Sequence, residues 1–160
     1  MYYSLIHAEV PPVASHFSRA SIQRSHAYLS LARHDPRAPC GLVSESEIHF
    51  KTDVFYTYKT GFPGGTSPDF DNTLVREMLV GEEAPMRALW AEADRFAREI
   101  EKQQISFNGR NLPEAYNCRA ALIAILQHVG MDFYPPERAH DSSGTKANLW
   151  GDMQRRLARG

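Results

Sequence analysis

The run of small and aliphatic residues between Ala120 and Leu126 constrains the fold of this chain more than any other segment. It lies within a stretch that predicts a helix beginning near Asn117 and ending at His128, with Gly130 as the stop. Because this helix is apolar nearly all round, it has to be buried on every side. The rest of the chain is therefore expected to form the layers that surround it.

Other segments show helical periodicity. In residues 84–103, with Pro85 in the first turn, the apolar residues at helical spacing are Met86, Leu89, Trp90, Ala93, Phe96 and Ile100. A closing amphipathic helix is predicted by Leu149, Trp150, Met153 and Leu157. We also expect short helices over residues 13–24 and over residues 71–79, the second capped by Asp71.

β-branched and aromatic residues predict strands in three places. The segments are Tyr2–Val10, His26–Leu31 and Glu47–Lys59, the last as one long bent strand or two short ones. Turn residues dominate segments 34–41 and 61–69, of which the second is a plain connection or a lid. The expected fold class is α+β, a small antiparallel sheet with helices packed on one face.

Length and charge exclude several classes. A chain of 160 residues is expected to form a single domain, residues 1–160, and to bury about two thirds of its unfolded surface without a metal or disulfide framework. With 18 basic and 19 acidic side chains, the net charge is -1, which argues against a nucleic-acid partner. No apolar run approaches the roughly 18 residues of a membrane span, and the first residues lack the pattern of a signal peptide. We expect synthesis in the cytosol, with any export through a specialised route.

Cys118 is the leading candidate for chemistry. A cysteine at a helix N-terminus has a lowered pKa and attacks as the thiolate, although a free cysteine is more often a small core residue. The second cysteine, Cys40, lies in a Pro-Cys-Gly turn and reads as an incidental thiol, and one bridge between the two cysteines is compatible with the sequence.

A thiolate nucleophile needs a base, normally histidine, and a group that orients it. His26 opens one predicted strand and His49 lies in the next. In an antiparallel pair the start of one strand lies beside the end of the next, so the two histidines are expected to be neighbours. No paired-histidine or paired-cysteine motif indicates a metal, and no cofactor is expected.

The segment His26-Ala27-Tyr28-Leu29, a polar residue on the next strand and then Asn117-Cys118 at a buried helix together resemble the circularly permuted papain-like fold. This group includes permuted relatives of the NlpC-type peptidoglycan peptidases and the lecithin:retinol acyltransferase-like enzymes. The resemblance spans about residues 24–130. It implies Cys118 as nucleophile, His26 as base and His49 as orienting residue. The gap between the two histidines is longer than is usual in this group, and Asp53, four positions after His49, is the alternative orienting residue.

These observations predict a cysteine-dependent hydrolase that cleaves an amide or ester bond through an acyl-enzyme. Backbone N–H groups at the helix start, with Asn111, Tyr116 and Asn117, would hold the oxyanion. The resemblance favours peptidoglycan amides as substrates, then acyl lipids, and the compact chain is also the form of a secreted antibacterial effector with a cognate inhibitor protein. The alternative is a non-catalytic immunity or adaptor protein that binds its partner through some of its 17 aromatic residues, two Trp, seven Tyr and eight Phe.

Overall fold

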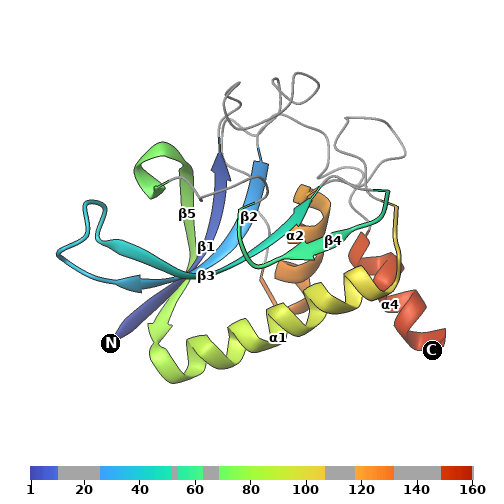
Figure 1. Cartoon of the computed structure of the whole chain (residues 1–160). Helices are drawn as coiled ribbons and strands as arrows, with labels where there is room; N and C mark the ends of the chain where they lie inside the picture. The colour runs from blue at the N-terminus through green and yellow to red at the C-terminus, as the bar shows by residue number, and fades with distance from the viewer. Residues whose placement is uncertain (11–25, 52–53, 63–68, 107–117, 132–148, 160) are drawn as a thin grey trace, which may run out of the picture.

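The computed structural model describes residues 1–10, 26–51, 54–62, 69–106, 118–131 and 149–159. In this part of the chain a five-stranded antiparallel sheet packs against three helices (Figure 1). The strands are β1 (Tyr2–Val10), β2 (His26–His34), β3 (Leu42–Lys51), β4 (Thr57–Lys59) and β5 (Leu74–Glu82). The helices are α1 (Glu83–Lys102), α2 (Cys118–His128) and α4 (Leu149–Arg159), and a short 3-10 helix, η2 (Phe70–Asn72), precedes β5. The predicted α+β class is confirmed.

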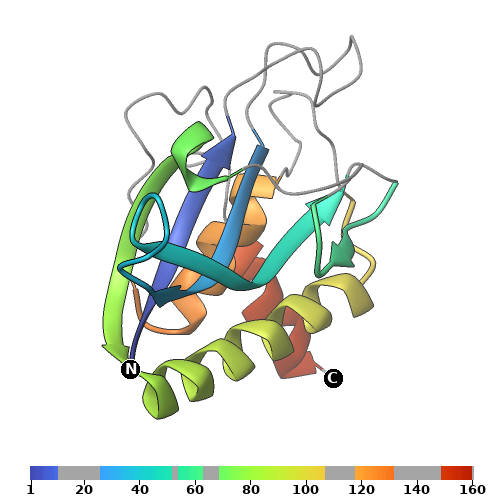
Figure 2. The same ribbon diagram turned by 60° about the vertical axis from the view of Figure 1, so that its left-hand side comes forward.

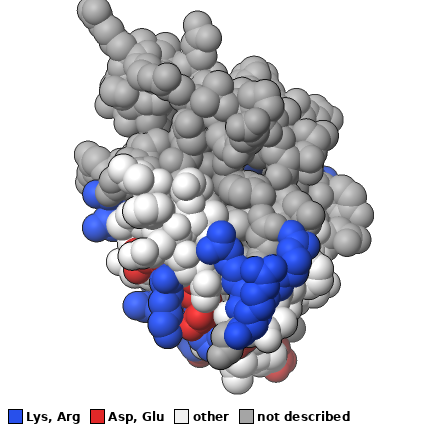
Figure 3. All heavy atoms as spheres, turned by 90° about the vertical axis from the view of Figure 1, so that its right-hand side faces the viewer, with Lys and Arg blue, Asp and Glu red and all other residues white. Residues whose placement is uncertain are grey.

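The strand order is β4-β3-β2-β1-β5. β1 and β5 are therefore paired in the sheet, although they lie far apart in sequence. α1 crosses one end of the strands, and α2 lies behind the sheet in contact with β2, β3, α1 and α4 (Figures 1 and 2). The face of the molecule that carries α4 is rich in Lys and Arg (Figure 3). α4 itself has three exposed arginines, Arg155, Arg156 and Arg159.

α2 confirms the prediction of a buried central helix, because every residue from Ala120 to Leu126 is buried. The helix ends where the sequence places its stop. Gly130 has a φ of 86°, which a residue without a Cβ adopts at little cost, and the Met131 N–H then donates to the Leu126 carbonyl at 2.8 Å. The helices expected over 84–103 and near the C-terminus are confirmed as α1 and α4.

The strand predictions are confirmed with longer boundaries. β2 continues to His34, and the segment Glu47–Lys59 divides into two strands, of which β3 begins earlier, at Leu42. The helix expected over residues 13–24 and most of the 61–69 loop lie outside the described residues.

The helix expected over residues 71–79 is wrong. η2 covers only Phe70–Asn72, and the residues that follow form β5, which pairs with β1 along its whole length. The local sequence permits a helix, but β1 has a second edge whose backbone groups need partners. Long-range pairing therefore overrides the local pattern, and the β-branched Val75 and Val80 suit the strand.

The two faces of the sheet have separate clusters of buried side chains. On one face the strands pack against the helices, and the strand residues there are Tyr3, Leu5, Ala27, Leu29, Leu31, Ile48 and Phe50. On the other face the cluster consists of Ile6, Ala8, Val10, Tyr28, Ala32 and Phe62. Side chains alternate along a strand, so these clusters tell on which face each candidate site residue lies.

Candidate functional site

Two histidines and a glutamate form a hydrogen-bonded chain on β2 and β3. The Nε2 atom of His26 lies 2.8 Å from Nδ1 of His49, and Nε2 of His49 lies 2.7 Å from Oε1 of Glu47. Glu47 and His49 are two positions apart on β3, so they share a face, while His26 reaches across from the first residue of β2. The prediction that His26 and His49 are neighbours is confirmed.

The hydrogen bonds between Glu47, His49 and His26 have a defined donor and acceptor order. An ionised Glu47 only accepts hydrogen bonds, so Nε2 of His49 carries the proton and donates it. Nδ1 of a neutral His49 then accepts, which makes Nε2–H of His26 the donor. In this tautomer the lone pair of His26 lies on Nδ1, the atom that can receive a proton.

Aromatic rings enclose the two imidazoles. The ring of Tyr28 stacks on His49 with centroids 4.5 Å apart, and Phe62 meets both imidazoles edge-on, with centroids 5.3 Å from His26 and 5.7 Å from His49. Burial, with a smaller contribution from His49, lowers the pKa of His26 to about 3. Burial also raises the pKa of Tyr28, with Glu47 adding to the effect. At neutral pH, His26 and Tyr28 are therefore both uncharged.

Cys118 is the first residue of α2 and is half-buried. It packs against the core cluster between the sheet and the helices, whereas His26 and His49 contact Tyr28 and Phe62, which belong to the cluster on the opposite face. Cys118 therefore lies on the helix side of the sheet, and the two histidine side chains lie on the opposite side.

Cys118 and His26 nevertheless lie at the same end of the strands. The next residue of α2, Arg119, forms a buried ion pair with Glu9 of β1. Glu9 is the register partner of Ala27, and Val10 is the partner of His26. The start of α2 is thus held against the end of the sheet at which β2 begins.

The remaining predicted site residues have different outcomes. Asp53, Asn111, Tyr116 and Asn117 lie outside the described residues. Cys40 is exposed in the turn before β3, and both cysteines are free thiols, so they do not form a bridge.

The sequence did contain the signal for Glu47, which was missed as an orienting residue. On a strand, side chains at i and i+2 lie on the same face, so Glu47 was a candidate partner for His49 as soon as the segment was predicted to be extended. The Ser44 hydroxyl also donates to Glu47, to Oε2 at 3.1 Å, which fixes the orientation of the carboxylate.

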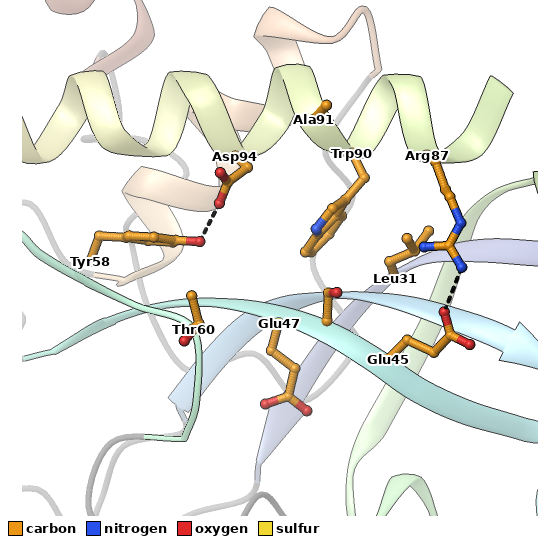
Figure 4. A pocket seen from close by; sticks show the side chains of 10 residues that line it. Leu31, Glu45, Glu47, Tyr58, Thr60, Arg87, Trp90, Ala91 and Asp94 are labelled. Carbon is orange, nitrogen blue, oxygen red and sulfur yellow. Dashed lines mark hydrogen bonds and ion pairs between the residues drawn. The ribbon is translucent and has the colours of Figure 1, made fainter. Parts of the chain in front are cut away.

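A cleft of about 480 Å³ lies between α1 and the strands β3 and β4 (Figure 4). Its lining combines apolar and polar surface and comes from ten residues: Leu31, Glu45, Ser46, Glu47, Tyr58, Thr60, Arg87, Trp90, Ala91 and Asp94. Glu47 borders this cleft, but its side chain points away from α1 and binds His49 on the other face of β3 (Figure 4). The cleft was not predicted, because its walls come from segments about 40 residues apart in sequence.

Metal and membrane sites were searched in the same part of the chain. Within the described ranges, no cluster of three His, Cys, Asp or Glu side chains is arranged to hold a metal ion. None of the helices in these ranges is long and apolar enough to cross a membrane.

Comparisons of the chain with family models, with curated proteins and with solved structures gave no match. Membership of a papain-like family therefore stays a prediction made from the His26 and Asn117-Cys118 segments.

Proposed function

We propose that this chain is a hydrolase of amide or ester bonds, in which the Glu47–His49–His26 chain supplies the base and Cys118 supplies the nucleophile. The supporting observation is the 2.8 Å contact between His26 and His49, at the end of the sheet where α2 begins with Cys118. A base, an orienting group and a helix N-terminal thiol are the parts that nucleophilic catalysis by cysteine requires.

The hydrogen bonds from His26 to His49 and Glu47 allow His26 to act as a base although it is buried. A neutral His26 is ready to accept a proton at neutral pH, but its low pKa means that a lone imidazolium would be unstable there. The hydrogen bonds let the charge move: a proton taken up at Nδ1 of His26 releases the Nε2 proton to His49, which passes its own to Glu47. The carboxylate thus ends protonated, and no charge remains on the buried rings.

In the proposed reaction the Cys118 thiol gives its proton to His26, and the sulfur bonds to the substrate carbonyl carbon. The bond to the leaving amine or alcohol breaks, and the leaving group takes the proton back. Water then repeats the sequence on the thioester, which releases the acid and restores the thiol. The two side chains start from different faces, so this scheme requires them to meet the substrate beyond the end of β2.

The substrate class and setting of the proposal come from the resemblance to the permuted papain-like group. Peptidoglycan stem-peptide amides are the first choice and acyl lipid esters the second. A role as a secreted antibacterial effector, countered by a cognate inhibitor protein, is part of the same proposal.

A non-catalytic partner-binding protein is the second candidate. It is favoured by one observation, that Cys118 packs within the core on the helix side while the histidines lie on the other face of the sheet. In this alternative the histidine chain stabilises the fold, and the cleft beside α1 belongs to an interface.

Activity measurements on matched variants separate these candidates. Peptidoglycan fragments and acyl esters are incubated with wild type, Cys118→Ser, His26→Gln and Glu47→Gln, with Cys40→Ser as the control for loss of a thiol elsewhere. We expect Cys40→Ser to be fully active and both Cys118→Ser and His26→Gln to lose at least about 1000-fold in kcat, since nucleophile and base act as a unit. An active Cys118→Ser together with an inactive His26→Gln would show that the reaction does not require the Cys118 thiol. Inactivity of the wild type on both substrate classes would favour the binding protein.

A further inference from the structure

The cleft beside α1 contains charged and aromatic side chains that have no role in the proposed hydrolysis. Figure 4 shows Arg87, Trp90 and Asp94 projecting from successive turns of α1 toward the strands, with Tyr58 beside Asp94 and Glu45 opposite Arg87. Its volume of about 480 Å³ lies within the range of small-molecule sites, which combine an apolar surface with a few placed polar groups.

The charge of the lining is negative. Two carboxylates, those of Glu45 and Asp94, point into the cleft beside a single guanidinium, that of Arg87, which leaves a formal excess of one negative charge (Figure 4). The Glu47 side chain points away from α1 and binds His49. Arg87 already holds Glu45 at 3.0 Å and Glu83 at 3.1 Å, so its positive charge is shared with a carboxylate outside the cleft. A concave, partly desolvated surface of one sign concentrates ligands of the opposite sign.

Asp94 keeps acceptor capacity for a ligand. Its Oδ1 accepts from the Tyr58 hydroxyl and its Oδ2 from Nε of Arg98 at 2.9 Å. A carboxylate has about four acceptor positions, so two donors do not saturate it. The carboxylate is also partly exposed, which leaves it accessible from the cleft.

Trp90 supplies an aromatic surface beside these carboxylates. Its half-buried indole projects from α1 into the cleft between Arg87 and Asp94 (Figure 4). The other aromatic ring of the lining, Tyr58, already has the Arg98 guanidinium over it, 5.1 Å from the ring centroid. The face of Trp is the strongest of the aromatic side chains for attracting a cation.

We infer that this cleft binds an organic cation, an ammonium or guanidinium group on an aliphatic stem, with the stem and charge against Trp90 and the donors directed at Asp94. The aromatic face of Trp90 and the accessible acceptor positions of the Asp94 carboxylate both select a cation over a neutral or anionic group of the same shape. β3 forms one wall of the cleft and also carries Glu47 and His49 on its other face, so in the hydrolase the bound group would be a basic part of the substrate. Only this last step rests on the proposed function.

Binding is tested without catalysis, through the fluorescence of Trp90. The protein has two tryptophans, and Trp150→Phe leaves Trp90 as the only one. The probes are butylguanidinium and butylurea, which have nearly the same shape but differ in charge. We expect saturable binding of butylguanidinium that is at least about tenfold tighter than that of butylurea, and that weakens as salt rises.

Two variants locate the site. Asp94→Asn keeps the shape of the side chain and an acceptor for Tyr58, and it should weaken butylguanidinium binding about tenfold. The control, Asp71→Asn, removes one negative charge from the exposed η2 segment and should leave the affinity unchanged. Calorimetry on Trp90→Leu, in the presence of Trp150, should show loss of binding, with circular dichroism confirming that each variant is folded.

Equal affinities for the two probes, or an unchanged affinity in folded Asp94→Asn, would overturn the inference. Binding without any hydrolysis would support the cation site and count against the hydrolase. Hydrolysis by a protein that does not bind butylguanidinium would support the hydrolase and count against the cation site.

Discussion

His26 and His49 are 23 positions apart in sequence, yet Nε2 of one lies 2.8 Å from Nδ1 of the other. Their rings are stacked, with centroids 5.1 Å apart and planes inclined by 5°. Two parallel imidazoles at this distance cannot both be protonated at low cost, because like charges raise each other's energy. The pair therefore makes the stability of the fold sensitive to acid, as does the buried His7.

The stability of the protein should fall as the pH decreases from about 6.5 toward 3. Burial lowers the pKa of both His26 and His7 to about 3, assisted at His7 by Arg119, while both titrate near 6.5 when unfolded. Between these values the unfolded state binds more protons, so each histidine removes about 1.4 kcal/mol of stability per pH unit. Urea unfolding at pH 7, 6 and 5 measures the slope. His7→Gln should make it shallower by about one proton, and parallel curves for wild type and variant would refute the prediction.

Breaking the ion pair between Arg119 and Glu9 should destabilise the protein strongly. Both side chains are buried, with exposed fractions of 5% and 0%. Arg119→Met leaves the Glu9 carboxylate without this countercharge and should cost about 3–5 kcal/mol in the free energy of unfolding.

The double variant Glu9→Gln, Arg119→Met removes both charges and should be more stable than Arg119→Met alone. A double-mutant cycle by urea unfolding measures the coupling between the two residues. Simple additivity of the two single effects would show that the pair does not contribute as a unit.

His128 is expected to matter for stability and not for activity. Its ring stacks on Phe96 of α1 at 4.1 Å between centroids, and its Nε2 lies 2.7 Å from Oε1 of Glu92. His128→Ala loses both contacts between α1 and α2 and should cost about 1–2 kcal/mol, a decrease of several degrees in Tm.

Glu92→Gln is the matched control, since it weakens the polar contact and keeps the stacked rings. It should cost less than His128→Ala in thermal unfolding. A large loss of kcat in His128→Ala, without a change in Tm, would instead place His128 in the active site.

The two thiols should respond differently to pH. Cys40 is exposed and Cys118 is half-buried, so access alone favours labelling of Cys40 by iodoacetamide. If the start of α2 stabilises the thiolate of Cys118, the ratio of Cys118 to Cys40 labelling should rise as the pH is lowered from 8 to 6. Peptide mass spectrometry measures this ratio.

A denatured sample shows that both thiols can be labelled. Exclusive labelling of Cys40 at pH 6 in the native protein, with both cysteines labelled after denaturation, would identify Cys118 as a core residue. The partner-binding alternative would then be preferred.

The elements that the sequence predicts correctly are those whose pattern is local. In α1 the apolar residues repeat at helical spacing, and in α2 the apolar run is followed by Gly130, so both helices follow from periodicity and a stop signal. The neighbouring positions of His26 and His49 also follow, because antiparallel pairing of consecutive strands was expected and observed.

The predictions are wrong or incomplete where a segment's structure is decided by a contact with residues distant in sequence. The residues of β5 became a strand because the edge of β1, more than 60 positions earlier, offered its backbone groups for pairing. Nor could periodicity show on which face of the sheet the N-terminus of α2 would lie relative to His26.

The sequence by itself thus determined the three long helices, which of their residues the core requires and that two histidines would meet, because these depend on residue spacing. Only the tertiary structure decided that Cys118 and His26 lie toward opposite faces of the sheet and that Glu45, Trp90 and Asp94 share a cleft. The physical reason is that a face or a cavity is a property of packed layers. It depends on how α1 and α2 settle on the sheet, and no stretch of the chain contains that information alone.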